Sequence, residues 1–151
     1  MARRAGPLAR TSAFWDASAL VPLCVRQGIT PSVEILYESY RVVIWWATPV
    51  EIASALARLV RTNEISTTDC AKARQVLVAL ADEWSVIQPS NALRDHAMRL
   101  VDRYDLKAAD AMQLAAAFDW CDKVPLGEVF LTADQKLREE AVLCGFDGKL
   151  I

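Results

Sequence analysis

Short apolar runs alternate along this chain with longer segments whose apolar residues recur at helical spacing. The runs are rich in Val, Ile, Phe and Trp and are bounded by polar residues or proline, which is typical of buried strands. Strands that alternate with helices predict an α/β fold, with a parallel β-sheet of about four to five strands flanked by helices on both sides. The expected strands are TSAFWD (11–16), RVVIWWA (41–47), EWSVIQP (83–89) and EVFLTAD (128–134).

The segments between these strands place apolar residues three and four positions apart, as Ile52, Leu56 and Leu59 are, which predicts amphipathic helices. Two consecutive helices are expected between the first two strands. A minimal crossover needs only one, so the helix pair over 17–40 is a candidate partner surface. The expected helices cover 16–27, 30–40, 49–61, 67–81, 91–103, 106–120 and 134–144.

The length of 151 residues suits one domain with a substantial core, which we place at 11–151. Residues 1–10 contain three arginines and are expected to form a flexible basic tail. No run of about 18 uninterrupted apolar residues exists, so no membrane-spanning helix is expected. The net charge of −2 excludes nucleic-acid binding by bulk charge, and any such activity must come from a local site or an added subunit.

The cysteines and the single histidine, His96, exclude several kinds of site. The cysteines lie far apart without a C-x-x-C pair, which argues against zinc and against a disulfide framework. Reduced thiols in a cytoplasmic protein are expected instead. One isolated histidine also weakens any Ser-His-Asp or Cys-His mechanism, because each requires a well-placed base. The cysteines are Cys24, Cys70, Cys121 and Cys144.

An acidic residue stands at three junctions between an expected strand and the following helix. Asp16 ends the first strand, and Glu51 and Asp134 lie in the first helical turns after the second and the last. In a parallel sheet these junctions share the carboxyl edge, so the three side chains are expected to converge.

Helix capping offers an alternative explanation for these acids. Asp16 is a good N-cap residue. Thr48 and Glu51 have the spacing of a capping box, and Thr132 and Gln135 have the same spacing. Each acid taken alone is therefore explained more readily by local structure than by chemistry.

Asp110 is the acid that capping explains poorly. It lies in LKAADAMQLAAAF (106–118), several residues into an expected helix of small and apolar side chains. A carboxylate on such a face is unfavourable to bury without compensation. We therefore expect Asp110 to point toward the other three acids. Four carboxylates in one pocket repel one another, so either some of them are protonated or a divalent cation holds them together. A site made only of oxygen ligands favours Mg²⁺ or Mn²⁺, which commonly serve phosphoryl chemistry.

Four segments in this order and spacing resemble a PIN-domain protein, most closely VapC-type toxins of toxin–antitoxin pairs: FWDASALVPL, TPVEIASAL, LKAADAMQLAAA and VFLTADQKL. The resemblance covers roughly 11–151 and implies a parallel sheet flanked by helices and a Mg²⁺- or Mn²⁺-dependent endoribonuclease. Ala17 stands where many relatives have Thr, which is not expected to affect metal binding. The resemblance assigns catalysis and metal binding to Asp16, Glu51, Asp110 and Asp134, with Ser18 and Thr132 as supporting hydroxyls.

The resemblance also implies partners: a cognate antitoxin protein, an RNA substrate and a second copy in a homodimer, with DNA contacted only through the antitoxin. The aromatic residues Tyr37, Trp45 and Trp46 are candidates for the antitoxin surface. Alternatively, the two tryptophans simply face opposite sides of a buried strand. Basic residues that either hold RNA phosphates or form a solvated face are Arg94, Arg99, Arg103 and Lys107.

Three other functions remain open. A non-toxic PIN nuclease in RNA processing or decay would use the same residues. A phosphoacceptor signalling domain needs paired acids near the first strand, whereas this strand ends in the lone Asp16. A binding module without catalysis would not need all four acids.

Overall fold

The computed structural model describes residues 10–25 and 30–151. Within this part of the chain, five strands form one parallel sheet in the order β3-β2-β1-β4-β5. The prediction of a parallel α/β fold is confirmed. The strands are β1 (Thr11–Trp15), β2 (Tyr40–Trp45), β3 (Ser85–Ile87), β4 (Val129–Thr132) and β5 (Asp147–Leu150).

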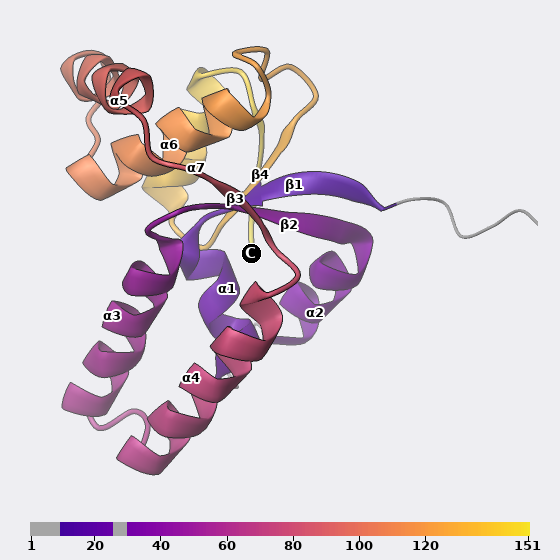
Figure 1. The fold of residues 1–151 in the computed structure, drawn as a ribbon, viewed down its shortest axis with the longest axis vertical. Helices are drawn as coiled ribbons and strands as arrows, with labels where there is room; N and C mark the ends of the chain where they lie inside the picture. Colours follow the sequence, from indigo (N-terminus) through magenta and orange to yellow (C-terminus); the bar gives the residue numbers. More distant parts are fainter. Residues whose placement is uncertain (1–9, 26–29) are drawn as a thin grey trace, which may run out of the picture.

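Helices cover both faces of the sheet. The first four lie on one face and the last three on the other (Figure 1). Neighbouring residues of the central strands point to opposite faces, so that Trp15 packs in the first core and Phe14 in the second. Burial on both faces explains why these strands read as continuous apolar runs. The helices are α1 (Ala17–Cys24), α2 (Thr30–Ser39), α3 (Thr48–Arg61), α4 (Thr67–Ala81), α5 (Asn91–Arg103), α6 (Ala108–Trp120) and α7 (Gln135–Leu143).

The ends of the chain differ from the sequence expectation in one respect. β5 was not among the expected strands, because its segment, DGKL, has no apolar run. It is ordered by pairing with β4, in the register Val129 opposite Asp147.

Residues 1–9 of the predicted tail and 26–27 of the first predicted helix lie outside the described residues. Arg10 donates from Nη1 to the carbonyl of Tyr37 at 3.1 Å.

The two tryptophans at the end of the second strand, Trp45 and Trp46, have different environments. Trp45 ends β2 and is 4% exposed, so it belongs to the core rather than to a partner surface. Trp46 lies beyond the strand and is 55% exposed. The prediction that the two face opposite sides of a buried strand is therefore wrong for Trp46, and the prediction of a surface role is wrong for Trp45.

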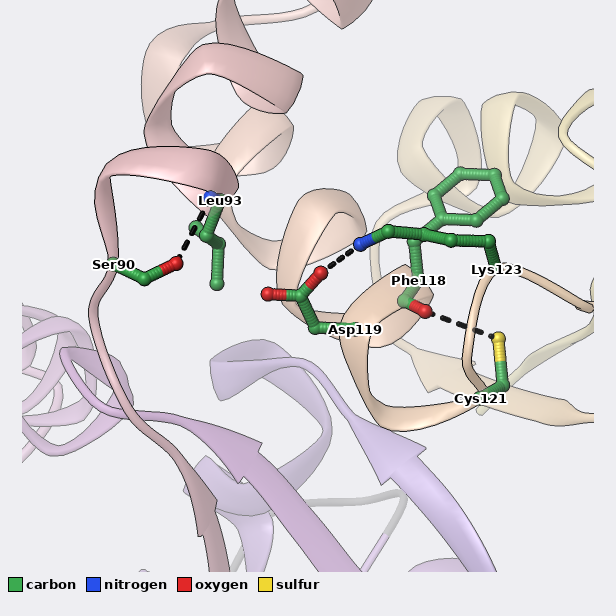
Figure 2. A network of polar contacts seen from close by, with 6 residues as sticks. All are labelled: Ser90, Leu93, Phe118, Asp119, Cys121 and Lys123. Carbon is green, nitrogen blue, oxygen red and sulfur yellow. Dashed lines mark hydrogen bonds and ion pairs between the residues drawn. The ribbon is translucent and has the colours of Figure 1, made fainter.

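Local hydrogen bonds define the start of α5 and the end of α6, which pack against each other (Figure 2). The Ser90 Oγ accepts from the Leu93 N–H at 3.0 Å and caps α5. At the end of α6, Cys121 Sγ donates to the Phe118 carbonyl, and Lys123 pairs with the Asp119 carboxylate. These contacts fix one end of α6, whose other end carries Asp110.

All four cysteines are free thiols, with Cys24 and Cys70 buried and the other two partly buried. None of the helices in the described residues combines the length and the apolar character that crossing a bilayer requires.

The strand order creates a crevice at one edge of the sheet. The chain moves from β1 to β2 and β3 in one direction, and then returns to place β4 and β5 on the other side of β1. The order therefore reverses between β1 and β4. In open parallel sheets such a switch point leaves a crevice outside the carboxyl ends of the strands, where ligands bind.

Candidate active site

A cavity of about 350 Å³ lies at the carboxyl ends of β1 and β4, at the switch point of the sheet. The four acids predicted from the sequence all line it, although they come from different parts of the chain. The cavity, called the acidic pocket below, is lined by Asp16, Ser18, Glu51, Arg58, Asp110 and Asp134, together with small and apolar side chains.

Asp16 is the N-cap of α1, as predicted, and is only 5% exposed. Its backbone N–H donates to the Leu131 carbonyl at 2.9 Å, which fixes the start of α1 beside β4. Its Oδ2 accepts from the Ser18 N–H (3.2 Å), from Ser18 Oγ and from Thr132 Oγ1 (3.0 Å). Burial raises the pKa of Asp16, and these donors only partly oppose that increase.

Ser18 and Thr132 connect the Asp16 carboxylate to the turn after β4. Ser18 Oγ accepts from the Ala133 N–H at 2.9 Å, and Thr132 Oγ1 accepts from the Asp134 N–H at 3.0 Å. The two hydroxyl oxygens lie 3.1 Å apart. Both side chains therefore orient Asp16 and brace the turn that carries Asp134.

Glu51 lies in the first turn of α3, but not in the predicted capping box. The helix begins at Thr48, and its N-cap, Ala47, makes no side-chain hydrogen bond. The box was wrong because Thr48 Oγ1 instead accepts from Gln113 Nε2 at 3.2 Å. The same nitrogen donates to Glu51 Oε1 at 3.1 Å.

Gln113 is a site residue that the sequence analysis missed. It is 0% exposed, and its Oε1 has no hydrogen-bond partner in the described part of the chain. The available signal was an amide side chain in an apolar helix, three residues after Asp110 and so on nearly the same helix face. Its partner lies 62 residues away in sequence, which no local pattern reveals.

Asp110 occupies the first turn of α6, which corrects the sequence argument. The segment was expected to be helical from 106, but α6 begins at Ala108, with Lys107 as a cap that makes no side-chain hydrogen bond. Asp110 is thus close enough to the helix start for the helix dipole to favour a carboxylate. Its side chain nevertheless lines the acidic pocket, as predicted.

Burial and neighbouring acids raise the pKa values of Glu51 and Asp110. Burial is the largest cause for Glu51, whose pKa rises to about 7, with further increases from Asp16 and Asp110 and an opposing effect of Gln113. Burial is also the largest cause of the raised pKa of Asp110, and the charges of Asp16 and Asp134 raise it further. The carboxylates are therefore close enough to repel one another.

Asp134 is the N-cap of α7 rather than a residue of its first turn. Its Oδ1 accepts from the Leu137 N–H at 3.0 Å. The predicted box between Thr132 and Gln135 is wrong, because Thr132 Oγ1 binds the backbone of Asp134 instead. The side chain still lies on the wall of the acidic pocket.

The predicted basic residues do not gather at the pocket. Arg99 and Arg103 line a separate cavity formed with α6 and α7. Arg94 is exposed and lies 3.4 Å from Asp95. Of these four residues, only Lys107 affects the acidic pocket, because its charge lowers the pKa of Asp110.

Comparison with known proteins adds to this geometry. The family model of the PIN domain matches residues 13–142, which include all four acids. The chain belongs to the PIN-domain family. The resemblance in the four sequence segments is thereby confirmed. No curated protein sequence matches the chain significantly.

Solved structures share the fold of this PIN domain at low sequence identity. A toxin–antitoxin complex from Klebsiella pneumoniae is 17% identical, with a TM-score of 0.64 over 93% of this chain and 100% of that one. VapC20 of Mycobacterium tuberculosis, a toxin that cleaves the sarcin–ricin loop, is 16% identical, with a TM-score of 0.65 over 93% and 100%. VapBC2 from Rickettsia felis, bound to a promoter DNA fragment, is 9% identical, with a TM-score of 0.61 over 90% and 96%.

The chemistry of the pocket in this PIN domain fits a hard divalent cation. The acids offer only oxygen donors, which Mg²⁺ and Mn²⁺ prefer. Two unit charges ~5 Å apart repel by about 3 kcal/mol at an effective dielectric of ~20, and a cation would offset that repulsion. Within the described residues, no three acidic, cysteine or histidine side chains form a preformed ion site. The acids share one cavity without meeting at one point.

Proposed function

We propose that this PIN domain is a metal-dependent endoribonuclease that hydrolyses RNA phosphodiester bonds. The observation that carries the proposal is the presence of all four acids in one pocket at the switch point of the sheet. The raised pKa values of Asp16, Glu51 and Asp110 are in line with it, because burial, and for Glu51 and Asp110 also the neighbouring acids, disfavour the charged carboxylates unless a cation offsets that cost.

The residues have distinct roles in this proposal. Asp16, Glu51 and Asp110 would hold Mg²⁺ or Mn²⁺, and Asp134 would complete the site. The ion would favour deprotonation of a water molecule and stabilise charge on the phosphate. In the hydrolysis, the water oxygen bonds to phosphorus while the bond to the leaving oxygen breaks, and the leaving oxygen gains a proton.

The neighbouring polar residues would keep the acids in place. Ser18 and Thr132 hold Asp16 through three hydrogen bonds to Oδ2, and Gln113 holds Glu51. Fixed ligands need less reorganisation when an ion binds. A neutral amide at Gln113 steadies Glu51 without competing with a cation for it.

We further propose that the nuclease is the toxin of a type II toxin–antitoxin pair, that it acts in the cytoplasm as a homodimer, and that it contacts DNA only through its antitoxin. Support comes from the shared fold with toxin–antitoxin complexes, one of which is bound to promoter DNA. The exposed Trp46 and Ile35, 55% and 66% exposed, provide apolar surface of the kind that a partner protein covers.

The decisive variant is Asp110→Asn, which removes one negative charge from the pocket and nearly preserves side-chain shape. We expect the wild type to cleave single-stranded RNA with Mn²⁺ or Mg²⁺ and to stop when EDTA is added, while the variant does not cleave. Expression of the wild type without a partner should arrest growth, whereas expression of the variant should not.

Mn²⁺-dependent thermal unfolding supplies the control. Mn²⁺ should raise the melting temperature of the wild type, because an ion that binds only the folded state stabilises it, and should affect Asp110→Asn much less. Full cleavage by Asp110→Asn would refute the nuclease site. RNA cleavage without growth arrest would instead favour the non-toxic PIN nuclease.

A further inference from the structure

A second cavity continues the acidic pocket along α3. It has a volume of about 260 Å³, and it shares Glu51, Ala55 and Arg58 with the acidic pocket. We call this second cavity the α3 groove; Ser54 and Arg61 complete its lining. Residues three and four apart form one stripe on a helix, so the groove runs along one face of α3 from its acidic first turn to its basic last turn.

The two arginines of the α3 groove are exposed and have no ion-pair partner in the described part of the chain. Arg58 lines the acidic pocket together with Glu51, yet the two side chains form no ion pair. The positive charge of Arg58 remains available to an external anion.

The starts of α6 and α7, which carry Asp110 and Asp134, have less free positive charge. Lys107 is the N-cap of α6, and Lys136 lies in the first turn of α7. Lys136 is already paired with Asp105 at 2.6 Å. The α3 groove is therefore the flank of the pocket where two basic side chains lack acidic partners.

We propose that the α3 groove binds the phosphate backbone of single-stranded RNA next to the cleavage site, with Arg58 and Arg61 as phosphate-binding residues. This inference rests on the proposed nuclease function for the identity of the ligand. RNA that approaches four carboxylates is repelled, and the net charge of −2 supplies no general attraction. Arginine suits phosphate because its planar guanidinium donates two parallel hydrogen bonds.

The dimensions of the groove agree with a strand that extends beyond the cleaved bond. Arg61 lies ten positions after Glu51, which corresponds to about 15 Å along a helix axis. If one RNA phosphate lies in the acidic pocket, the next phosphates of the same RNA strand lie over this face of α3. Because the acids stand at the start of α3 and the arginines at its end, the RNA strand has one defined path along the helix.

The test measures binding of a short fluorescein-labelled single-stranded RNA by anisotropy, with Mn²⁺ present and Asp16→Asn in every protein to prevent cleavage. Arg58→Ala should weaken binding about tenfold, because a charge-assisted contact is lost. The slope of log affinity against log salt should fall by about 0.7 for each lost contact, and by about 1.4 when Arg61→Ala is added. Arg58→Lys keeps the charge and should retain the slope.

Arg74→Ala is the matched control, because Arg74 is an exposed arginine of α4 that lines neither cavity. It changes net charge equally and should leave affinity and slope nearly unchanged. Binding by Arg58→Ala with unchanged affinity and slope, or an equal loss in Arg74→Ala, would overturn the inference.

Cleavage assays in the otherwise unmodified protein separate this inference from the proposed function. Arg58→Ala should raise the KM for RNA more than it lowers kcat. If the unmodified protein binds RNA through Arg58 but cleaves none with any divalent ion, the nuclease proposal fails and the groove inference stands. If it cleaves RNA and Arg58→Ala has no effect on KM, the groove inference fails and the nuclease proposal stands. Absence of any RNA binding refutes both.

Discussion

The two sides of the acidic pocket are built differently. On the strand side, Asp16 and Asp134 are helix N-caps whose carboxylates accept backbone N–H groups of their own helices. On the helix side, Glu51 and Asp110 lie in the first turns of helices whose N-cap residues make no side-chain hydrogen bond. The strand-side acids thus serve both folding and the site, whereas the helix-side acids contribute little to folding beyond a favourable position in the helix dipole.

This difference makes the helix-side acids more informative about function than the strand-side acids. An N-cap aspartate needs no chemical role to explain its presence. Partly buried carboxylates with raised pKa values oppose folding unless something compensates them, and this is the state of Glu51 and Asp110. A divalent cation in the pocket would supply that compensation. The helix side is therefore the better evidence for a metal-binding function.

The largest expected effect comes from substitutions of Asp16, which separate its role as a helix cap from its proposed role in metal binding. Asp16→Asn keeps an oxygen that can cap α1 but loses the charge, so RNA cleavage should fall by at least about a hundredfold while stability is retained. Asp16→Ala should lose the same activity and also about 1 kcal/mol of unfolding free energy, because the cap is removed. Urea unfolding and RNA cleavage measured on both variants test this pair.

Asp110→Asn is the matching helix-side control. It should lose activity without loss of stability, and in metal-free buffer it should be at least as stable as the wild type. The comparison between the two sides fails if Asp110→Asn is destabilised as strongly as Asp16→Ala, or if Asp16→Ala unfolds at the wild-type urea concentration.

A smaller effect is expected from Gln113, which holds the helix side together. Gln113→Leu fills a similar volume but removes the donor to Glu51, so Mn²⁺ affinity should fall about tenfold. Stability should change little, because the variant also removes a buried oxygen that lacks a partner. Calorimetric titration with Mn²⁺ and urea unfolding measure the two quantities.

Thr48→Val separates the two contacts of that amide. It removes one acceptor of Gln113 Nε2 and leaves the donor to Glu51 in place. Its effect on Mn²⁺ affinity should therefore be smaller than that of Gln113→Leu. Equal losses in both variants would show that Gln113 acts through packing of the helix pair rather than by positioning Glu51.

The sequence predicts the parallel sheet and the four acids because both depend on local patterns. The apolar runs that form β1, β2 and β4 mark strands buried on both faces, and three of the acids follow strand ends that share one edge. Asp110 is the exception, and it is marked instead as a carboxylate within an apolar helical segment. β5 lacks such a pattern, since its formation depends on an available edge of β4. Lys107 likewise gives no capping signal, so the start of α6 at Ala108 was not predicted.

Contacts between segments that are distant in the sequence could not be predicted from local patterns. Gln113 and Glu51 are joined by a side-chain hydrogen bond between α6 and α3. Thr48 and Thr132 have good capping spacing, but tertiary partners take up their hydroxyls instead. Arg58 lies seven residues after Glu51, as the printed sequence shows, but only the cavities reveal that both line one groove.

The helix side of the pocket also makes the stability of the metal-free protein depend on pH. The pKa of Glu51 rises from 4.5 to about 7 on folding, so the folded protein retains a proton that the unfolded chain releases. Stability should therefore decrease as pH rises through this window in EDTA, and Glu51→Gln should reduce that decrease. With saturating Mn²⁺ the dependence should reverse, because metal ligands must be deprotonated and protons compete with the ion. Urea midpoints measured across the window test both signs, and a decrease of equal slope with and without Mn²⁺ would show that the ion does not bind at Glu51.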